Sequence, residues 1–400
     1  IITWTLHTNR MKRITKKVLW TAALTQAVWC AKAQSAGDLV EQVRARYAPD
    51  KRVAVFEIEA EQVNDTLYIL KGKCDDPEAV RALRERLRRG GVAFEDYTTL
   101  LPSRALGDRT QALVTLSSVN LRTAPAHAAE FATQAILGTP LRVLDVQGGW
   151  YRVQTPDGYI SWVDDDAIAL KTPGEMESWR MSQRFIYTGY IGFVYAGPDE
   201  EGSRVSDLVL GTVLEVDPAG KTNRKFIAVR LPDGRSGYVK RSETQDFTEW
   251  AARELRPDGL ERTARSMMGV PYLWGGTSVK GVDCSGMVKT AYFANGVILA
   301  RDASQQALTG EKIAPEAWRD CRKGDLLFFG NAQTGRVTHV AMYLGDGKFI
   351  HASGRVKVNS IDPQAEDFVG YPCLSISRIV GRIGTPGIAR VAGHPWYFNR

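Results

Sequence analysis

The feature that most constrains this chain is the stretch Asp283-Cys284-Ser285-Gly286, which opens a pattern typical of an α-helix. From Ser285 to Phe293 apolar side chains recur at helical spacing, and Asn295-Gly296 follows as a helix end would. The sequence therefore predicts a helix with Cys284 in its first turn.

A pattern typical of a β-hairpin follows farther along the chain. Residues 340–344 and 348–350 predict two strands, and Gly345-Asp346-Gly347 predicts the turn between them. Folding the chain at this turn would bring His339 and His351 opposite or diagonal to one another. Because both numbers are odd, the two imidazoles are expected on one strand face, provided that no bulge intervenes.

Together, Cys284, His339 and His351 predict a cysteine hydrolase. A thiol attacks as its thiolate, and both a helix N-terminus and a neighbouring base lower the pKa of a thiol. One imidazole can serve as this base while the other fixes its tautomer. A cysteine or a histidine taken alone is more often an ordinary core or surface residue. Here the helix start and the hairpin tie the three side chains together, which favours the catalytic interpretation.

Five motifs surround these residues in a fixed order. They are Pro271-Tyr272-Leu273-Trp274-Gly275-Gly276, Asp283-Cys284-Ser285-Gly286, Gly324-Asp325-Leu326-Leu327-Phe328-Phe329, Thr338-His339-Val340-Ala341-Met342-Tyr343 and His351-Ala352-Ser353. In this order they resemble the NlpC/P60 cysteine peptidases, over about residues 260 to 385. The resemblance implies a compact papain-like α+β domain.

Carried over by position, the resemblance implies a role for four side chains. Cys284 is expected as the nucleophile, His339 as the general base and His351 as the orienting third member. The Tyr272 hydroxyl is expected to help stabilise the oxyanion, because a tetrahedral intermediate needs fixed donors where negative charge develops. No metal and no cofactor is expected, since two histidines and a cysteine fit the thiol mechanism better than a metal site.

Three smaller domains are expected ahead of the catalytic one. Residues 37–105 predict a small α-β-β-α-β domain that resembles BON domains, with its first strand at the alternating residues Val53, Val55 and Glu57. Residues 112–170 and 178–245 resemble bacterial SH3 (SH3b) domains, which are small β-barrels. Lys171-Thr172-Pro173-Gly174 is expected to be the linker between the two barrels.

The expected fold class is therefore a multidomain α+β protein. A papain-like NlpC/P60 domain over residues 255–385 is preceded by two SH3b barrels and a small α/β domain, and residues 386–400 are expected to be a C-terminal tail. This order resembles the YkfC-like γ-D-glutamyl-L-diamino acid endopeptidases, also called dipeptidyl-peptidase VI. In that family the first SH3b domain closes the active site to all but a peptide with a free N-terminal L-alanine.

The resemblance also implies which residues contact the peptide. An ammonium in a closed pocket needs a carboxylate partner, and Asp302 stands at the family position that holds it. Its alternative role is an N-cap for the following helix. The residues expected to bind substrate are Asp302, Trp274, Asp283, Ser285 and Glu130, with Tyr159 or Trp162 as the lid aromatic. Trp274 could instead be a core residue, and Glu130 a solvated loop acid.

The expected function is hydrolysis of the γ-D-glutamyl–diamino acid bond of murein peptides with a free N-terminal L-alanine. The partner is then a murein tripeptide or a related peptidoglycan stem peptide, while the preferred diamino acid and the oligomeric state stay open. Two alternatives remain. One is a peptidoglycan hydrolase that cuts stem peptides still attached to polymer, and the other is a non-catalytic wall-binding SH3b protein.

Residues 1–33 have the layout of a secretory signal. Met11 is the expected start, followed by a basic cluster, an apolar run over residues 18–28 that is too short to span a bilayer, and expected cleavage after Ala33. A lipoprotein anchored through Cys30 is less consistent, because Trp29 is too bulky for such a cleavage site. We therefore expect an exported protein, periplasmic or extracellular, without a membrane span once the leader is removed.

The net charge of +7 suggests a nucleic-acid or membrane partner, but its distribution argues against one. Residues 1–33 hold six of the seven excess positive charges and no acidic residue. The rest of the chain is nearly neutral, so no nucleic-acid partner is expected.

Four cysteines remain after the leader: Cys74, Cys284, Cys321 and Cys373. A nucleophilic Cys284 must stay free, which leaves an odd three. Cys321 and Cys373 either pair or remain free thiols.

Overall fold

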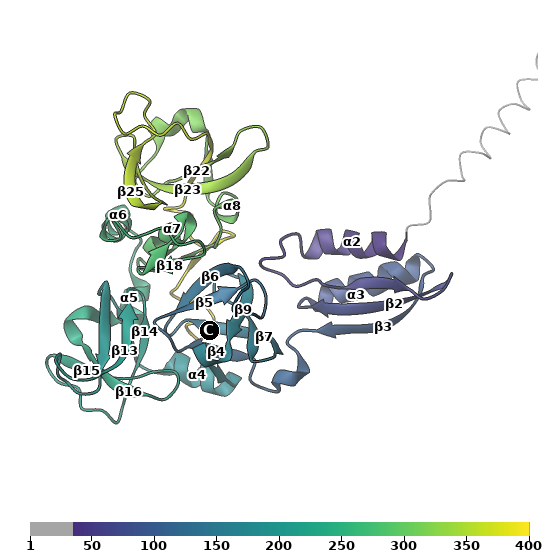
Figure 1. Ribbon diagram of the computed structural model, residues 1–400, viewed down its shortest axis with the longest axis horizontal. Coiled ribbons are helices and arrows are strands. Elements are labelled where there is room, and N and C mark those ends of the chain that lie inside the picture. Colours follow the sequence, from purple (N-terminus) through teal and green to yellow (C-terminus); the bar gives the residue numbers. More distant parts are fainter. Residues whose placement is uncertain (1–34, 400) are drawn as a thin grey trace, which may run out of the picture. The chain divides into compact units, whose positions relative to one another are not determined.

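The computed structural model describes residues 35–399, which form two compact units (Figure 1). The first unit comprises Phe56–Thr99 and the described residues up to Pro49. The second comprises Asp50–Val55 and the residues from Leu100 onward. The expected leader, with Met11, Cys30 and Ala33, lies outside the described residues. Within residues 35–399, none of the helices is long and apolar enough to cross a membrane.

The first unit is a three-stranded sheet with two helices packed on it. Its elements are α2 (Ala36–Tyr47), β1 (Glu59–Gln62), β2 (Leu67–Cys74), α3 (Pro77–Arg89) and β3 (Ala93–Leu100), with sheet order β1-β2-β3. Leu39, Val43 and Leu83 of the helices are buried with Leu70 of β2. The predicted strand at residues 53–57 was wrong: its only pairing is an isolated bridge at Phe56.

The second unit begins with two seven-stranded sheets of identical topology. The first has the order β10-β4-β7-β8-β9-β5-β6 and the second β17-β11-β14-β15-β16-β12-β13, so each strand of one has a counterpart in the other. The strands of the first are β4 (Gln111–Val114), β5 (Ser118–Arg122), β6 (Phe131–Ile136), β7 (Pro140–Gln147), β8 (Trp150–Gln154), β9 (Ile160–Asp164) and β10 (Ile168–Lys171). Those of the second are β11 (Arg184–Tyr187), β12 (Ile191–Tyr195), β13 (Arg204–Val209), β14 (Val213–Val216), β15 (Phe226–Arg230), β16 (Ser236–Lys240) and β17 (Thr244–Asp246).

The two segments predicted as a linker and a tail are both ordered parts of the fold. Lys171 ends β10, and Thr172 caps helix α4 (Pro173–Met181) by accepting from the backbone N–H of Glu175. At the other end, β27 (Ile388–Arg390) pairs with β20 (Val297–Leu299), and Tyr397 is fully buried. The prediction of a tail was wrong because Tyr397 packs on aromatic residues from distant parts of the chain, which local composition does not register. Residues 171–174 do join the two sheets, but as the end of β10 and the start of α4.

The remainder of the unit packs helices against a six-stranded antiparallel sheet of order β21-β26-β22-β23-β24-β25. Helix α7 (Cys284–Phe293) lies against β23, with Met287 and Val288 in the same core as Val340 and Met342. The sheet strands are β21 (Glu311–Ile313), β22 (Leu326–Asn331), β23 (Arg336–Gly345), β24 (Lys348–Ser353), β25 (Arg355–Ser360) and β26 (Cys373–Arg378). The remaining elements are α5 (Phe247–Ala252), α6 (Pro257–Ser266), β18 (Thr277–Ser278), β19 (Gly281–Val282) and α8 (Ala303–Gln306).

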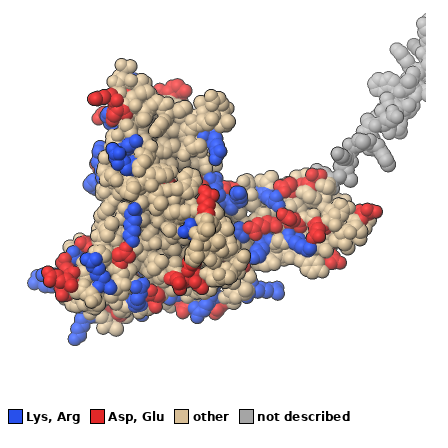
Figure 2. Space-filling model, in the orientation of Figure 1, with Lys and Arg blue, Asp and Glu red and all other residues tan. Residues whose placement is uncertain are grey.

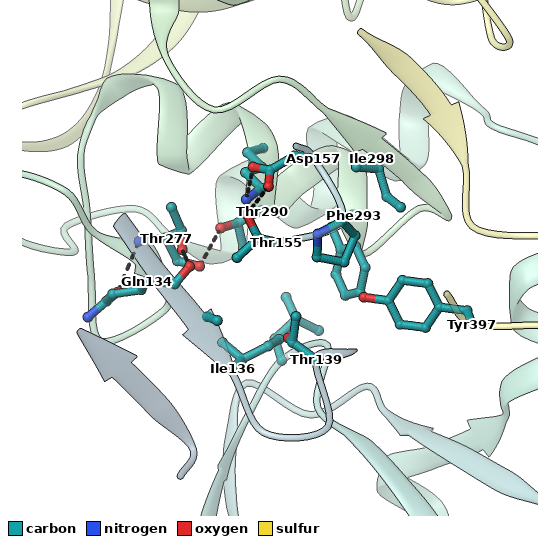
Figure 3. A pocket seen from close by; sticks show the side chains of 14 residues that line it. Gln134, Ile136, Thr139, Thr155, Asp157, Thr277, Thr290, Phe293, Ile298 and Tyr397 are labelled. Carbon is teal, nitrogen blue, oxygen red and sulfur yellow. Dashed lines mark hydrogen bonds and ion pairs between the residues drawn. The ribbon is translucent and has the colours of Figure 1, made fainter. Parts of the chain in front are cut away.

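The first seven-stranded sheet docks on this catalytic part through polar contacts and one buried ion pair. Gln134 of β6 accepts from the backbone N–H of Thr277 at 3.0 Å, and Lys289 of α7 pairs with Asp157 at 2.5 Å. Burial alone would raise the pKa of Asp157, but the ammonium of Lys289 lowers it. Gln134, Asp157 and Thr277 line a cavity at this junction (Figure 3). Since Cys284 and the two histidines do not line it, the cavity belongs to the domain junction.

Tyr397 joins elements that are distant in sequence, and its removal should destabilise the second unit. Its ring packs against Trp179, Phe247 and Phe293, and 1% of its surface is exposed. Tyr397→Ala should lower the free energy of unfolding by roughly 3–5 kcal/mol, the usual cost of deleting a buried aromatic side chain. Urea unfolding followed by near-UV circular dichroism measures this. Tyr397→Phe keeps the ring and serves as the control; equal midpoints for wild type and Tyr397→Ala would contradict the packing role.

Candidate active site

Helix α7 begins at Cys284 because Asp283 caps it. The carboxylate of Asp283 accepts from the backbone N–H of Gly286 at 2.7 Å, which satisfies one of the free donors of the first turn. A side chain at Gly286 would lie 1.9 Å from the carbonyl oxygen of Gly276, so only glycine lets the Trp274-Gly275-Gly276 turn approach the helix. The predicted helix with Cys284 in its first turn is confirmed, and the thiol is 6% exposed.

A buried arginine holds this helix start in place. Arg301 donates to both carboxylate oxygens of Asp283, at 2.6 and 3.1 Å, and to the hydroxyl of Ser285 at 2.9 Å. Its Nε donates to the hydroxyl of Thr133 in β6 at 2.7 Å. The Asp283 carboxylate also accepts from the backbone N–H of Gly275 and from the Ser285 hydroxyl. Sequence reasoning assigned no role to Arg301, because nothing in its local pattern marks it as buried.

The two histidines contact one another across β23 and β24. His339 Nε2 lies 2.8 Å from His351 Nδ1, and His351 Nε2 lies 3.0 Å from Oδ1 of Asn359 on β25. The Asn359 amide N–H donates to the carbonyl of Asp367, so its oxygen faces His351. His351 therefore carries its proton on Nε2 and accepts from His339 Nε2–H, which leaves Nδ1 of His339 as the basic atom.

The histidines share one sheet face because of a β-bulge. Near the turn Gly345 pairs with Lys348, whereas Tyr343 pairs with Phe349, so β23 has one extra residue between them. Without this bulge, the register that pairs Gly345 with Lys348 would continue along both strands. Met342 would then lie opposite His351, and His339 would be on the other face of the sheet. The prediction that the two histidines lie close together on one face is confirmed. The condition attached to it, that no bulge intervenes, was wrong, because the bulge is what places both on that face.

Burial favours the uncharged forms of the nucleophile and its base. The pKa of the Cys284 thiol is raised to about 11 by burial and by the Asp283 carboxylate, although the backbone amides of Val340 and Ser285 oppose this. The pKa of His339 is lowered to about 4 by burial, then by His351 and Lys357. Both shifts run against the lowered thiol pKa that a helix start and a neighbouring base favour, because both groups are enclosed and Asp283 adds a negative charge.

Tyr272 and Trp274 lie on the turn that precedes the nucleophile. Burial, the sulfur of Cys284 and then Asp283 raise the pKa of Tyr272 to about 12, so its hydroxyl remains a donor near the thiol. Trp274 is 61% exposed, and its alternative interpretation as a core residue was wrong. Next to it, a side chain at Gly275 would lie 3.0 Å from the ring of Phe131 in β6, so the first sheet borders this turn.

At the other end of the site, Asp302 meets the first sheet. Its carboxylate accepts from the hydroxyl of Tyr159 at 3.3 Å and from Arg52 at 2.7 Å. Trp162 instead stacks with Arg152, whose guanidinium lies 5.8 Å from the ring centroid, and Glu130 is exposed in the loop before β6. Of the two candidate lid aromatics, the structure brings Tyr159 to Asp302. Arg52 was not anticipated, since its local sequence does not indicate a partner so far along the chain.

Two further side chains near the histidines were missed. Asn359 extends the histidine chain from β25, a strand that was not predicted; the alternating Val356 and Val358 before it were the available signal. Tyr371 is 43% exposed with its ring 6.1 Å from that of His339, and only the folded chain brings it there. Cys321 and Cys373 are free thiols, as is Cys74, so the pairing alternative is excluded in this structure.

On the visible face of the molecule, acidic and basic side chains are interspersed (Figure 2). Among the described residues, the only cluster of three acids or other ligands that could hold a metal ion is Asp164, Asp165 and Asp166. Two of its members are exposed, and none takes part in the hydrogen bonds described above for His339, His351 and the start of α7. This cluster therefore takes no part in the site.

Comparison with known proteins supports the fold and the class of enzyme. The model of the NlpC/P60 family matches residues 269–375, and that of the bacterial dipeptidyl-peptidase Sh3 domain matches residues 121–168. The chain is 32% identical over 270 residues to dipeptidyl-peptidase 6 of Lysinibacillus sphaericus, spanning 63% of this chain and 92% of that protein.

A curated protein and a crystal structure from Bacillus cereus are also similar. A γ-D-glutamyl-L-lysine dipeptidyl-peptidase is 31% identical over 240 residues, 56% of this chain and 68% of that protein. The crystal structure of an NlpC/P60 family protein matches with a TM-score of 0.58 and 24% identity, over 68% of this chain and 99% of that one, and so shows the fold. The chain is thus a multidomain, mostly β protein with a matched SH3 domain and with Cys284 at the start of α7. It belongs to the NlpC/P60 family of cysteine peptidases.

Proposed function

We propose that this peptidase hydrolyses the γ-D-glutamyl–diamino acid bond of murein peptides that carry a free N-terminal L-alanine. The observation that carries the substrate assignment is the hydrogen bond between Tyr159 of the SH3 domain and the Asp302 carboxylate, at 3.3 Å. A carboxylate held between two domains near the nucleophile helix suits a substrate ammonium. The similar proteins named dipeptidyl-peptidases agree with this substrate class.

In the proposed mechanism, Nδ1 of His339 takes the proton of the Cys284 thiol as the sulfur attacks the γ-carbonyl of D-glutamate. The Tyr272 hydroxyl and the backbone N–H of Cys284 donate to the oxyanion. His351 and Asn359 hold the imidazole in the required tautomer. His339 then protonates the leaving amine as the C–N bond breaks, which leaves a thioester on Cys284.

Hydrolysis of the thioester completes the cycle. Water gives a proton to His339 as its oxygen attacks the thioester carbonyl, and the proton returns to sulfur when the C–S bond breaks. The products are L-Ala-γ-D-Glu and the diamino acid or the peptide that begins with it. Trp274, which is exposed beside the nucleophile, and Ser285 are proposed to line the glutamate subsite. Asp283 is also proposed to line the glutamate subsite. Its carboxylate caps α7 and pairs with Arg301, which holds it in place there.

The place of action is proposed to lie outside the cytoplasm. The leader expected at residues 1–33 supports export, and a similar mycobacterial protein is named peptidoglycan endopeptidase RipB. In this setting the substrate is a soluble peptide released from the wall.

A second candidate function is cleavage of stem peptides still attached to polymer, whose alanine nitrogen is an uncharged amide. One observation favours it: Asp302 already accepts a charged hydrogen bond from Arg52 at 2.7 Å, so the carboxylate does not depend on a substrate ammonium.

The first prediction tests reaction and substrate together. The mature chain should cleave L-Ala-γ-D-Glu-diaminopimelate, and Cys284→Ala should not, as measured by chromatography of the released diaminopimelate. N-acetylation of the alanine should lower kcat/KM by about tenfold or more, because a charged hydrogen bond contributes roughly 1.5–3 kcal/mol. Equal kcat/KM for the two peptides would favour polymer-attached stems, and equal turnover by Cys284→Ala would refute the thiol mechanism.

The second prediction concerns the relay behind the base. Asn359→Ala removes the acceptor of His351 Nε2–H, so the tautomer of His339 is no longer fixed. We expect kcat to fall by about tenfold with little change in KM, because the residue does not contact substrate. Asn359→Asp keeps an acceptor and is the matched control. A change in KM alone would show that Asn359 acts on binding.

The third prediction concerns pH. With the thiol pKa raised to about 11 and the His339 pKa lowered to about 4, both groups are neutral at intermediate pH. The rate at which iodoacetamide alkylates Cys284 should therefore rise continuously from about pH 6 to about pH 9, because the thiolate fraction grows with pH below the thiol pKa. Cys284→Ala supplies the background of the other thiols. A plateau at neutral pH would instead indicate a thiolate–imidazolium pair in the free enzyme.

A further inference from the structure

A short N-terminal segment, Asp50–Val55, belongs to the same compact unit as the SH3 and catalytic domains. The backbone N–H of Ile160 donates to the carbonyl of Arg52 at 2.7 Å, at the start of β9. Val55 is buried in an apolar cluster with Leu101, Leu144 and Ile160. The segment is therefore fixed along the edge of the SH3 domain that carries Tyr159.

The guanidinium of Arg52 lies on the carboxylate of Asp302. One terminal nitrogen donates to Asp302 Oδ2 at 2.7 Å and to the Ser304 hydroxyl at 2.9 Å. The other two nitrogens donate to Asp50, at 2.8 and 2.7 Å, in a bidentate pair. Asp50 in turn accepts from the side chain of Gln305 at 2.8 Å. Arg52 is thus held in place from both sides and faces the same Asp302 oxygen that Tyr159 contacts.

This ion pair remains accessible to an incoming cation. The side chains of Arg52 and Asp302 are 33% and 28% exposed, so solvent screens the pair and a partner of equal charge can compete for it. An ammonium that approached Asp302 would meet the guanidinium charge at hydrogen-bond distance from the same carboxylate. Like charges at this separation repel one another.

We propose that Arg52 is a specificity-determining residue: its guanidinium competes with the N-terminal ammonium of the substrate for Asp302. Arg52 thereby weakens the preference of the enzyme for a free amine over a blocked one. The inference rests on the proposed function, because it takes Asp302 as the partner of the substrate amine. It assigns to the segment ahead of the SH3 domain a direct part in substrate selection.

Binding measurements in the inactive Cys284→Ala background test this proposal. The probes are L-Ala-γ-D-Glu-diaminopimelate and its N-acetylated form, each titrated by isothermal calorimetry. Arg52→Gln should lower the Kd of the free-amine peptide by about threefold or more, the scale of a partly exposed ion pair, and leave the Kd of the acetylated peptide unchanged. Lys51→Gln removes the same charge from the exposed neighbouring residue and should change neither Kd.

Asp50→Asn provides a second test with the opposite sign, because it removes the carboxylate that neutralises Arg52 while keeping the guanidinium. It should raise the free-amine Kd, whereas Arg52→Gln should lower it. Unchanged binding of the acetylated peptide shows that each variant is folded.

Four outcomes would overturn the inference. Weaker binding of the free-amine peptide to Arg52→Gln would mean that Arg52 orients Asp302 for the substrate instead of competing with it. An equal shift in Lys51→Gln would reduce the effect to overall charge. If the Cys284→Ala background binds neither peptide, the proposed function fails and the inference fails with it. If this background binds the peptides and Arg52→Gln changes neither Kd, the inference alone is overturned.

Discussion

The buried pair of Asp283 and Arg301 is the interaction on which the rest of the site depends. Burying two charges is costly unless each is fully hydrogen-bonded, and here both carboxylate oxygens and all three guanidinium nitrogens have partners. Through these bonds one ion pair joins the start of α7, the turn at Gly275 and strand β6 of the SH3 domain. Loss of either partner would leave an uncompensated charge directly beside the nucleophile.

The second constraint is a chain of hydrogen bonds across three adjacent strands. His339, His351 and Asn359 lie on β23, β24 and β25, and each reaches the next diagonally on one face of the sheet. The bulge near the turn of β23 and β24 makes this face common to both histidines. The enclosed site favours the neutral thiol and imidazole, so the thiol still carries its proton when the proposed reaction begins.

These two constraints meet at the border with the SH3 domain. Thr133 of β6 accepts from Arg301, and Tyr159 donates to the neighbouring Asp302, so consecutive residues of the catalytic domain both contact the SH3 domain. The nucleophile and the proposed amine site are therefore positioned by one short stretch of chain. Arg52 adds a third element to the same border, because its guanidinium donates to the Asp302 carboxylate.

The sequence alone determined the local features of the site. Helical spacing and the helix end at Asn295-Gly296 predicted α7 and the place of Cys284, and the turn at residues 345–347 predicted the hairpin. These follow from interactions between near neighbours, which local pattern encodes. Tertiary structure decided the raised pKa of the thiol, the role of Arg301, the ordered C-terminal strand and the contact of Arg52 with Asp302. Each depends on burial or on a partner far along the chain, and neither can be read from spacing.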